Sequence, residues 1–516
     1  MSESIPVEIP LLGLNTLDPF IAFDSGYARE LTNYALVNGR LRVRPGTTLD
    51  QGANTPTDIN WFTRAANYPA ITNAGDIVNL TSGAVTGSIG GACQCASTTV
   101  KHVSLELVIG CRAPRSTVAP FTAWTFTTGT ITATAITSAV SHQGRLCVSD
   151  GSTIEYSTLG AITGAMAGVY TVSSYMQGQT VIRMFSVTAQ PGNEANNVFV
   201  VFGSAGLVLV FSGDYPGSSN WQILGKFEMP TPVSNLGFHP IDGDVFVATS
   251  KYAYWFRDLF TGGAQTAYDN SPSRPIENLW QAVVWGGSFP AGQQEISYVI
   301  YFPEYDCLIC QCFESDTDFG NLGDCWNYAN EATWFVYFRR YKAWAIWATM
   351  PFFHPIINGY GNYRGTILTM DITAPNDTVN GTNKTKIETS WKTPFFYPKQ
   401  GRSKQLLGTM PFFRHTTKGY MPVIRGIYDM SDYNAPWGFY TQSTVTAIPP
   451  GRFTEGSIDV PAVSWNIYKE FCGIGGDGAG FSIQYSMNNA PTDTTDIQME
   501  IYNASVLFEG GREFPA

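Results

Sequence analysis

The sequence predicts an all-β protein, with a β-propeller followed by a second, β-sandwich-like platform domain. Apolar residues alternate with polar ones in short runs that Gly, Asn, Asp and Pro separate, which is typical of strands and hairpins. The 516 residues include 51 Gly and 30 Pro, and only 14% are charged against about 25% in typical globular proteins. Helical periodicity is nearly absent, so we expect few helices.

Residues 1–45 read as an extended lead-in that ends in a first strand. They contain the segment 13–20 (GLNTLDPF), the segment 27–34 (YARELTNY) and the strand 41–46 (LRVRPG). Proline at both ends of this region favours extended backbone. We therefore expect residues 1–45 to deliver the chain to a large β body.

Residues 46–375 are predicted to form the propeller. A strand, a short turn and a second strand recur at 144–157, 197–211, 243–256, 296–313 and 334–347. The spacing of roughly 40 to 55 residues is that of a four-stranded blade, and closing such sheets into a ring buries both faces of each. No WD or kelch motif accompanies the repeat, and a long protein of several β-sandwiches would give a similar pattern. The Thr-rich stretch near 117–140 is expected to be an insertion.

Residues 376–516 are predicted to form the platform domain. The polar, turn-rich stretch 371–389 marks the boundary, and alternating strands begin near Trp391. Residues 481–508 are expected to close the domain as hairpins. The run 473–480 (GIGGDGAG) lacks the Lys-Ser/Thr of a phosphate-binding loop, so we interpret it as a turn.

Charge and hydropathy narrow the classes of function. A formal charge of −11 argues against a protein that grips nucleic acid, since phosphate binding needs clustered Lys and Arg. It suits a conduit that lets DNA pass without specific binding, and it is equally ordinary for a soluble protein. The most apolar run, 198–211, is interrupted by glycines and is too short to span a bilayer, and the N-terminus has no basic and apolar leader. We expect a protein made in a cytosol, with no stable membrane insertion.

No catalytic, cofactor or metal site is predicted. Of the nine cysteines, Cys307, Cys310, Cys312 and Cys325 form the densest group, but a second CxxC pair is missing, so buried thiols are favoured over zinc. The five histidines stand in no catalytic motif. The acidic loop 314–324 has alternating oxygen ligands without an EF-hand register, which leaves calcium or a solvated loop open. Carboxylates such as Asp244, Asp258, Glu304 and Asp306 cannot be paired from sequence alone.

The N-terminal segments resemble the opening of the tail nozzle proteins of short-tailed phages (podoviruses), also called tail tubular protein B. The match covers about 35 residues, and a stretch beginning at Trp391 (WKTP) resembles the start of that family's platform. The motif positions, which are also the candidate positions for docking on the tail adaptor, are Gly13, Leu14, Asn15, Asp18, Pro19, Asn33, Arg42, Arg44, Pro45 and Gly46.

The resemblance implies a structural virion protein without catalytic activity, assembled in the host cytoplasm as a homo-hexamer. It implies a ring that forms the distal nozzle of the tail, serves as conduit and gate for DNA ejection, docks on the adaptor ring and holds tail fibres. The competing hypothesis is a host-surface carbohydrate-binding or glycan-degrading propeller. Aromatic residues such as Trp280, Trp285, Trp437 and Tyr440 are candidates for interface anchors or for the core.

Overall fold

The computed structural model describes a large part of the chain, and the account below concerns that part. The described residues are 2–17, 24–51, 59–62, 69–72, 76–79, 82, 84–88, 98–102, 105–109, 115–116, 130–131, 136–161, 165–188, 197–284, 299–314, 332–350, 354–357, 360–363, 366–371, 376–379, 383–396, 402–415, 423–428, 443–445, 457–460, 463–469, 472–478, 481–487 and 499–513.

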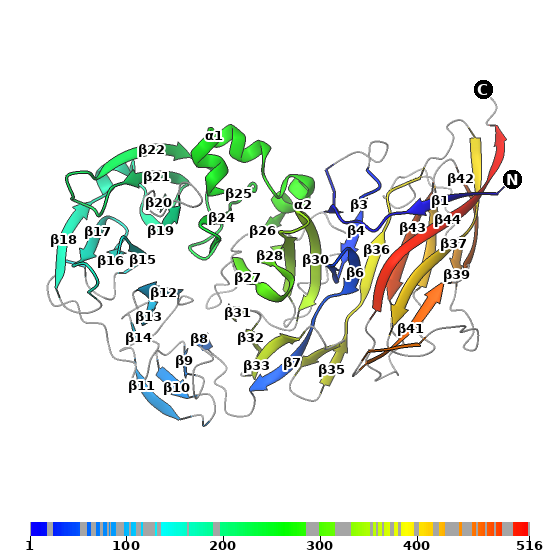
Figure 1. Ribbon diagram of the computed structural model, residues 1–516, viewed down its shortest axis with the longest axis horizontal. Coiled ribbons are helices and arrows are strands. Elements are labelled where there is room, and N and C mark those ends of the chain that lie inside the picture. The colour runs from blue at the N-terminus through cyan, green and yellow to red at the C-terminus, as the bar shows by residue number, and fades with distance from the viewer. Residues whose placement is uncertain are drawn as a thin grey trace.

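Within these residues the protein is almost entirely β, as predicted, and it has two parts (Figure 1). One part is a ring of small sheets, coloured from light blue through green. The other part, yellow to red with blue strands from the N-terminus, is a pair of larger sheets.

The ring contains seven sheets in chain order, which makes it a seven-bladed propeller over the described residues. The first three blades are β8 (Ile59–Phe62), β9 (Pro69–Thr72), β10 (Asp76–Asn79) and β11 (Val85–Ser88); β12 (Thr98–His102), β13 (Leu105–Ile109) and β14 (Arg115–Ser116); and β15 (Ser138–His142), β16 (Arg145–Ser149), β17 (Thr153–Ser157) and β18 (Met166–Thr171). The fourth and fifth are β19 (Val181–Thr188), β20 (Asn197–Gly203), β21 (Leu207–Ser212) and β22 (Gln222–Glu228); and β23 (Phe238–Ile241), β24 (Asp244–Ala248) and β25 (Ala253–Trp255).

Two short helices separate the fifth blade from the sixth, and a strand from the N-terminal region completes the seventh. The helices are α1 (Phe256–Asp269) and α2 (Glu277–Ala282). The sixth blade is β26 (Val283–Val284), β27 (Val299–Phe302), β28 (Cys307–Glu314), β29 (Ala332–Phe338) and β30 (Ala343–Met350). The seventh is β31 (His354–Ile357), β32 (Tyr360–Tyr363) and β33 (Thr366–Asp371), joined by β7 (Gly46–Gln51).

The pairing of β7 with β33 closes the ring. Gly46 lies opposite Asp371 and Thr48 lies opposite Thr369 in an antiparallel register. Because the first strand of the propeller region completes the sheet of its last strands, the ring is held shut by a ladder of backbone hydrogen bonds.

Strict alternation along the fourth blade explains why the sheets need each other. On β20, Val198, Val200 and Phe202 belong to the apolar cluster shared with the fifth blade. Phe199 and Val201, between them, belong to the cluster shared with the third blade. Each face is therefore buried against a neighbour, as the period of two requires. The five hairpins predicted from the sequence are all confirmed, as β16–β17, β20–β21, β24–β25, β27–β28 and β29–β30.

The second part is a β-sandwich, as predicted. Its first sheet contains β1 (Ser2–Val7), β5 (Tyr34–Val37), β6 (Arg40–Val43), β37 (Arg402–His415), β40 (Ser457–Val460), β41 (Val463–Lys469), β42 (Cys472–Gly478) and β44 (Met499–Glu513). Its second sheet contains β4 (Glu30–Thr32), β36 (Thr389–Lys392), β43 (Phe481–Met487), β38 (Val423–Tyr428) and β39 (Ser443–Val445). The sheets face each other through Phe481 and Phe508, whose ring centres are 6.0 Å apart, and through a 2.8 Å hydrogen bond between the hydroxyls of Thr409 and Tyr485.

The N-terminal region differs from the extended lead-in that the sequence predicts. β1 pairs with β44, β4 pairs with β36, and β6 pairs with β44, so residues 1–45 supply strands to both platform sheets. Two further short strands are β2 (Gly13–Leu14) and β3 (Tyr27–Ala28), and β2 contacts β30 of the sixth blade. The region is built into the body because its alternating apolar side chains complete the core.

Three other expectations also change. Residues 473–478 of the glycine-rich run interpreted as a turn belong to the strand β42, since their backbone pairs with β37 and pairing needs no side chain. The turn-rich stretch at the domain boundary holds the hairpin β34 (Asn376–Val379) and β35 (Asn383–Lys386), which extends the seventh blade past residue 375. β43 and β44 lie in different sheets and so form no hairpin with each other. Most of the expected insertion, 117–129 and 132–135, lies outside the described residues, and 138–140 belong to β15.

None of the helices among the described residues is long and apolar enough to cross a bilayer.

Candidate functional site

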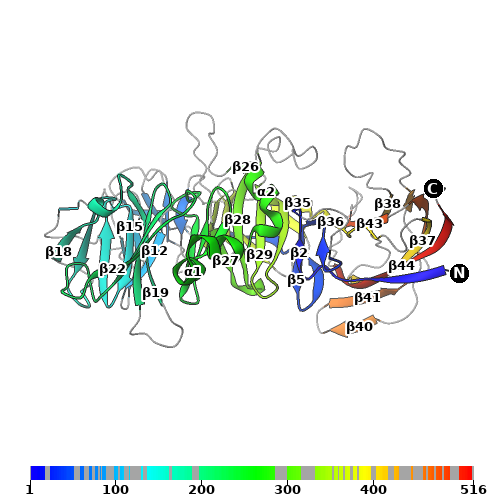
Figure 2. The same ribbon diagram turned by 90° about the horizontal axis from the view of Figure 1, so that it is seen from above.

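The motif-bearing N-terminal region passes between the propeller and the sandwich. Figure 2 shows β2 and β5 between the green strands of the sixth blade and the sandwich strands β36 and β43. At this boundary the sixth blade and the second sandwich sheet form one twelve-stranded sheet through the order β30, β4, β36. The candidate site is therefore the seam between the two parts.

Gly13 holds the backbone of the N-terminal region against the sixth blade. Its φ is +78°, and a Cβ built there would lie 2.5 Å from the backbone nitrogen of Trp344 and 2.6 Å from its carbonyl oxygen. Both the left-handed backbone and the close approach require glycine. The motif glycine is thus a structural contact between β2 and β30.

Asn15 continues this contact. Its backbone N–H donates to the carbonyl of Ala28 at 3.0 Å, and its Oδ1 accepts from the N–H of Leu17 at 3.0 Å. The N–H groups of Thr16 and Leu17 donate to the carbonyl of Pro275, just before α2. Leu14 and Asn15 are 2% and 3% exposed, so the segment is anchored between β3 and the helical connection.

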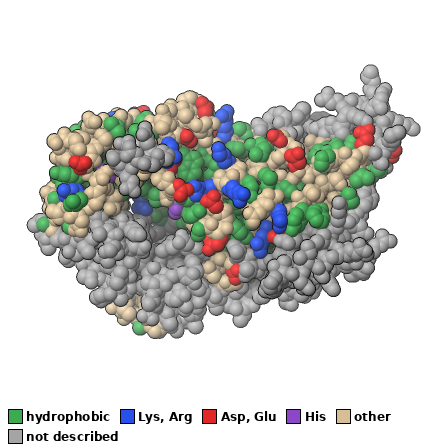
Figure 3. All heavy atoms as spheres, in the orientation of Figure 1, with side chains coloured by type: hydrophobic (Ala, Val, Ile, Leu, Met, Phe, Trp, Pro, Cys, Tyr) green, Lys and Arg blue, Asp and Glu red, His purple; other side chains and the backbone are tan. Residues whose placement is uncertain are grey.

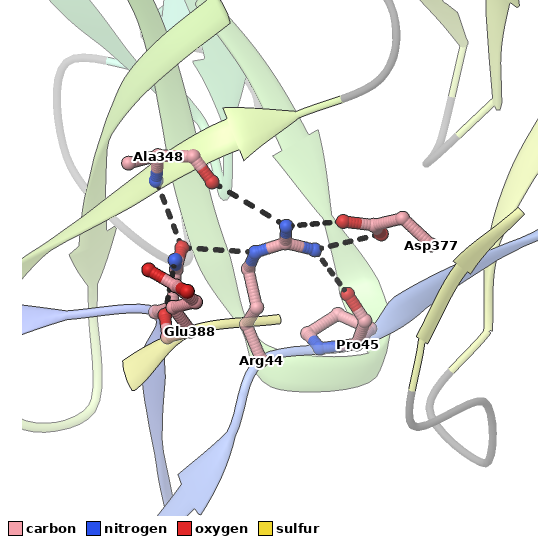
Figure 4. Close-up of polar contacts among 6 residues, drawn as sticks. Arg44, Pro45, Ala348, Asp377 and Glu388 are labelled. Carbon is pink, nitrogen blue, oxygen red and sulfur yellow. Dashed lines mark hydrogen bonds and ion pairs between the residues drawn. The ribbon is translucent and has the colours of Figure 1, made fainter. Parts of the chain in front are cut away.

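Asn33 and Arg44 form the centre of the seam, shown in Figure 4. Asn33 lies between β4 and β5 with φ at 58°, a conformation that asparagine tolerates better than most residues. Its Nδ2 donates to the carbonyl of Glu388 at 2.6 Å, and its Oδ1 accepts from the N–H of Ala348 at 2.8 Å and from Nε of Arg44 at 2.9 Å. One amide thus connects three distant segments.

The guanidinium of Arg44 satisfies all of its five donors. Besides the bond to Asn33, Nη1 donates to the carbonyl of Pro45 at 3.0 Å and to Oδ1 of Asp377 at 2.9 Å. Nη2 donates to Oδ2 of Asp377 at 2.5 Å and to the carbonyl of Ala348 at 3.4 Å. We call Asn33, Arg44, Ala348, Asp377 and Glu388 the Arg44 junction.

The ion pair between Arg44 and Asp377 at the centre of the Arg44 junction is buried. The side chains of Arg44 and Asp377 are 0% and 2% exposed. Two buried charges are tolerated only when paired and fully hydrogen-bonded, and the forked geometry of arginine against a carboxylate meets that condition. The pair fixes the start of β7 against β34 of the seventh blade and β30 of the sixth.

Large aromatic side chains surround the seam. Trp344 donates its indole N–H to the carbonyl of Pro272 at 2.5 Å, and Trp347 donates to the carbonyl of Tyr34 at 3.0 Å. The hydroxyl of Thr389 donates to that of Tyr34 at 3.1 Å. These bonds orient bulky rings that belong to the core shared by the sixth blade and the sandwich.

Most of the motif side chains in the described part of the chain are buried. Seven of them are buried, and their role in docking on an adaptor stays a prediction: Gly13, Leu14, Asn15, Asn33, Arg44, Pro45 and Gly46. Arg42, on β6, is partly exposed. Asp18 and Pro19 lie outside the described residues.

The other candidates are mostly core residues or lie outside the described part. Cys147, Cys307 and Cys310 are free, buried thiols, as expected, and burial raises the pKa of Cys147 to about 12. Trp280 is fully buried and donates to the carbonyl of Thr249, so it is a core residue. The side chains of Cys312, Cys325, Trp285, Trp437 and Tyr440, and residues 315–324 of the acidic loop, lie outside the described residues.

His142 is a structural residue of the third blade. It is 1% exposed, with Nδ1 2.8 Å from the Ser186 hydroxyl and Nε2 3.2 Å from the carbonyl oxygen of Gly213. Burial lowers its pKa despite the neighbouring carbonyl and Asp214. Among the described residues, no group of three or more His, Cys, Asp and Glu side chains converges as metal ligands would.

Sequence reasoning missed an open pocket between the fifth and sixth blades. It is lined by carboxylates, including Asp244 and Asp306, and by basic and aromatic side chains from β25, β29 and the turn before β30. Its residues come from segments about 100 positions apart. Asp244 and Asp306 are two of the carboxylates that could not be paired from the sequence, and the structure brings both into this lining.

Comparison with known proteins gives no family. No family model and no curated protein matches the chain. Among solved structures, similarity at 10%, 10% and 11% identity is found to Raptor from Chaetomium thermophilum, to the computationally designed Ika8 protein and to BBS1N in complex with ARL6DN. Each match covers 64% of this chain, and 29%, 100% and 98% of the other, with TM-scores of 0.36, 0.31 and 0.35. Scores this low carry no functional argument, and the all-β assignment stands on the strand pairing described above.

Proposed function

We propose that this protein is the nozzle of a short phage tail, a ring-shaped conduit and gate for DNA ejection that docks on the tail adaptor. The proposal rests on the resemblance of the N-terminal motif. One observation supports it: the motif residues Gly13, Asn33 and Arg44 join a propeller to a β-sandwich, which is the two-part architecture that the resemblance implies.

The Arg44 junction suits such a role. A nozzle has to keep the propeller fixed relative to the platform while a DNA molecule under pressure passes. A buried, fully bonded arginine and a sheet continuous from β30 to β36 resist relative rotation better than a flexible linker does. In this proposal the motif residues act through rigidity, and the adaptor contacts exposed surfaces elsewhere on the sandwich.

The negative formal charge of the protein is compatible with the passage of DNA. Six copies with a formal charge of −11 each carry −66, which disfavours stable contacts with phosphates along a lumen. Propeller loops that narrow the bore act as the gate, and tail fibres attach to the outer face. The mechanism is mechanical and the protein carries out no reaction.

Cryo-electron microscopy of the virion that carries this protein tests the proposal. We expect a six-fold ring on the tail axis, with the bore obstructed before DNA release and open afterwards. The intact particle is the appropriate sample, because the ring can require the adaptor for assembly. A monomer or trimer at the periphery of the particle, or an unobstructed bore before release, would contradict the proposal.

A further inference from the structure

The open pocket between the fifth and sixth blades has the composition of a binding site. Its volume is about 420 Å³, within the range of ligand pockets. We call it the Arg257 pocket. Figure 3 shows Lys, Arg, Asp and Glu side chains gathered on this face, over the part of the ring that holds β24, β25 and β27.

One wall of the Arg257 pocket carries fixed carboxylates. Nη1 of Arg339 donates to Oδ1 of Asp306 at 2.9 Å, and Nη2 pairs with Asp242. The hydroxyl of Tyr301 also donates to Oδ1 of Asp306, at 2.9 Å. The side chains of Asp242 and Asp306 are 71% and 44% exposed, so both carboxylates keep acceptor capacity toward the pocket while Arg339 holds their positions.

Basic side chains outnumber acidic ones in the lining of the Arg257 pocket. Arg257, Arg340 and Lys342 line the pocket together with Arg339, against the three carboxylates of Asp242, Asp244 and Asp306. Within the described part of the chain, Nε of Arg257 is buried without a hydrogen-bond partner. The carboxylate of Asp244 instead accepts from backbone N–H groups, those of Val245 at 2.8 Å and Arg257 at 3.0 Å. The lining thus carries one more basic than acidic side chain in a chain of net charge −11, which favours an anionic ligand, and Asp258 acts electrostatically on Arg257 and Lys342 from outside the lining.

An aromatic side chain supplies an apolar wall. Trp255 lines the pocket and is half-buried. Its ring packs edge-on against Phe246 with 5.3 Å between ring centres. Burial raises the pKa of Tyr337, which lines the same pocket, to about 12.

We propose that the Arg257 pocket binds an acidic sugar, a pyranose that carries a carboxylate. Arg257 and Lys342 pair with the sugar carboxylate, Asp242 and Asp306 accept from its hydroxyls, and Trp255 packs against the apolar face of its ring. A neutral sugar leaves the basic side chains unpaired, and an inorganic anion uses neither the carboxylates nor the indole. This site goes beyond a nozzle's mechanical role, because it gives the protein a contact with an acidic surface polymer.

Isothermal titration calorimetry of the full chain with galacturonic acid tests the proposal. Galactose serves as the neutral probe and sodium sulfate as the simple anion. We expect galacturonic acid to bind at least about tenfold more tightly than either, because each of the other probes lacks part of the charge-assisted and stacking contacts. Equal binding of galactose, equal binding of sulfate, or no heat with galacturonic acid overturns the proposal.

Single substitutions test whether galacturonic acid binds in the Arg257 pocket. Arg257→Gln and Lys342→Gln are each expected to weaken galacturonic acid about tenfold. Lys342 is exposed, so its variant remains informative if Arg257→Gln fails to fold. Lys226→Gln, which removes an exposed charge on β22 away from the pocket, is the matched control and is expected to bind as the wild type does. If all three variants bind equally, the ligand is held elsewhere and the assignment is wrong. This outcome is independent of the imaging that tests the nozzle proposal.

Discussion

At the residue scale, Gly13 is a position that leaves no room for a side chain. Gly13→Ala is expected to destabilise the protein, since the added methyl meets the Trp344 backbone at 2.5 Å and the φ of +78° strains any side chain. Gly39→Ala is the matched control, because Gly39 has a similar φ of +74° and nothing within 4 Å of its Cβ position. Thermal and urea unfolding of both variants measures the difference.

The difference between these two variants isolates the steric contact from the backbone strain. We expect Gly13→Ala to cost about 1 to 3 kcal/mol more than Gly39→Ala, the typical cost of overpacking. Equal losses would mean that β2 moves away from β30 without penalty, and the seam would then be looser than its geometry implies.

The buried pair of Arg44 and Asp377 permits a double-mutant cycle. Arg44→Met or Asp377→Leu alone leaves a buried charge unpaired, so each is expected to lower the free energy of unfolding by about 3 to 5 kcal/mol. The double variant is expected to lose less than the sum of the two. Urea denaturation of the four proteins gives the coupling energy.

The partly exposed pair of Arg40 and Glu500 is the control for this cycle. Its nitrogen and oxygen lie 3.2 Å apart and the Arg40 side chain is 39% exposed, so Arg40→Gln is expected to cost no more than about 1 kcal/mol. If Arg44→Met costs as little as Arg40→Gln, the Arg44 junction contributes no rigidity and the proposed mechanical role loses its support.

His239 makes stability depend on pH. Its pKa is lowered from 6.5 to about 4, mainly by burial, with the backbone of Val299 opposing the shift and the charge of Arg339 adding to it. Between these two pKa values the unfolded chain binds more protons than the folded one, so stability falls as the pH drops from about 6.5 to about 4.

Replacing His239 with glutamine is expected to flatten that part of the profile. Chemical denaturation of wild type and His239→Gln at several pH values between 4 and 8 gives the two slopes. The comparison removes the contributions of His142 and of the carboxylates, which both proteins share. Parallel profiles would show that His239 is protonated in the folded state and would contradict the expectation.

At the element scale, β1 covers an edge of the sandwich. It pairs with β44 from Ser2 opposite Glu509 to Val7 opposite Ala504. Deleting residues 1–7 is expected to leave the N–H and C=O groups of that edge unpaired, which speeds amide exchange in residues 504–509 and promotes aggregation. Hydrogen exchange with light scattering checks this, and deletion of Met1 alone is the control. Unchanged protection at 504–509 would mean that β1 adds nothing to the sheet.

At the scale of the whole molecule, the propeller and the sandwich share one core. Residues from β2, β4, β5, β28, β29, β30, β43 and β44 belong to the same apolar cluster. We therefore expect a single calorimetric unfolding transition, with Arg44→Met lowering its midpoint or splitting it in two. Two well-separated transitions in the wild-type protein would show that the parts unfold independently and that the seam is a weak interface.

The sequence by itself determined the class of the fold and its repeat. Alternating residues along 197–211 specify strands with two apolar faces, and such strands form stable structure only when sheets pack on both sides. The motif positions could also be picked out by resemblance. Their physical role could not, because a buried arginine and a surface arginine look alike in a sequence.

Only the tertiary structure decided how distant segments meet. Arg44 and Asp377 are separated by 333 positions, and Asp242 and Arg339 by 97. Such pairs depend on ring closure through β7 and on the packing of neighbouring blades, neither of which leaves a local pattern in the chain. The glycine run at β42 shows the same dependence: glycine favours turns locally, but pairing with β37 supplies the hydrogen bonds that make residues 472–478 a strand.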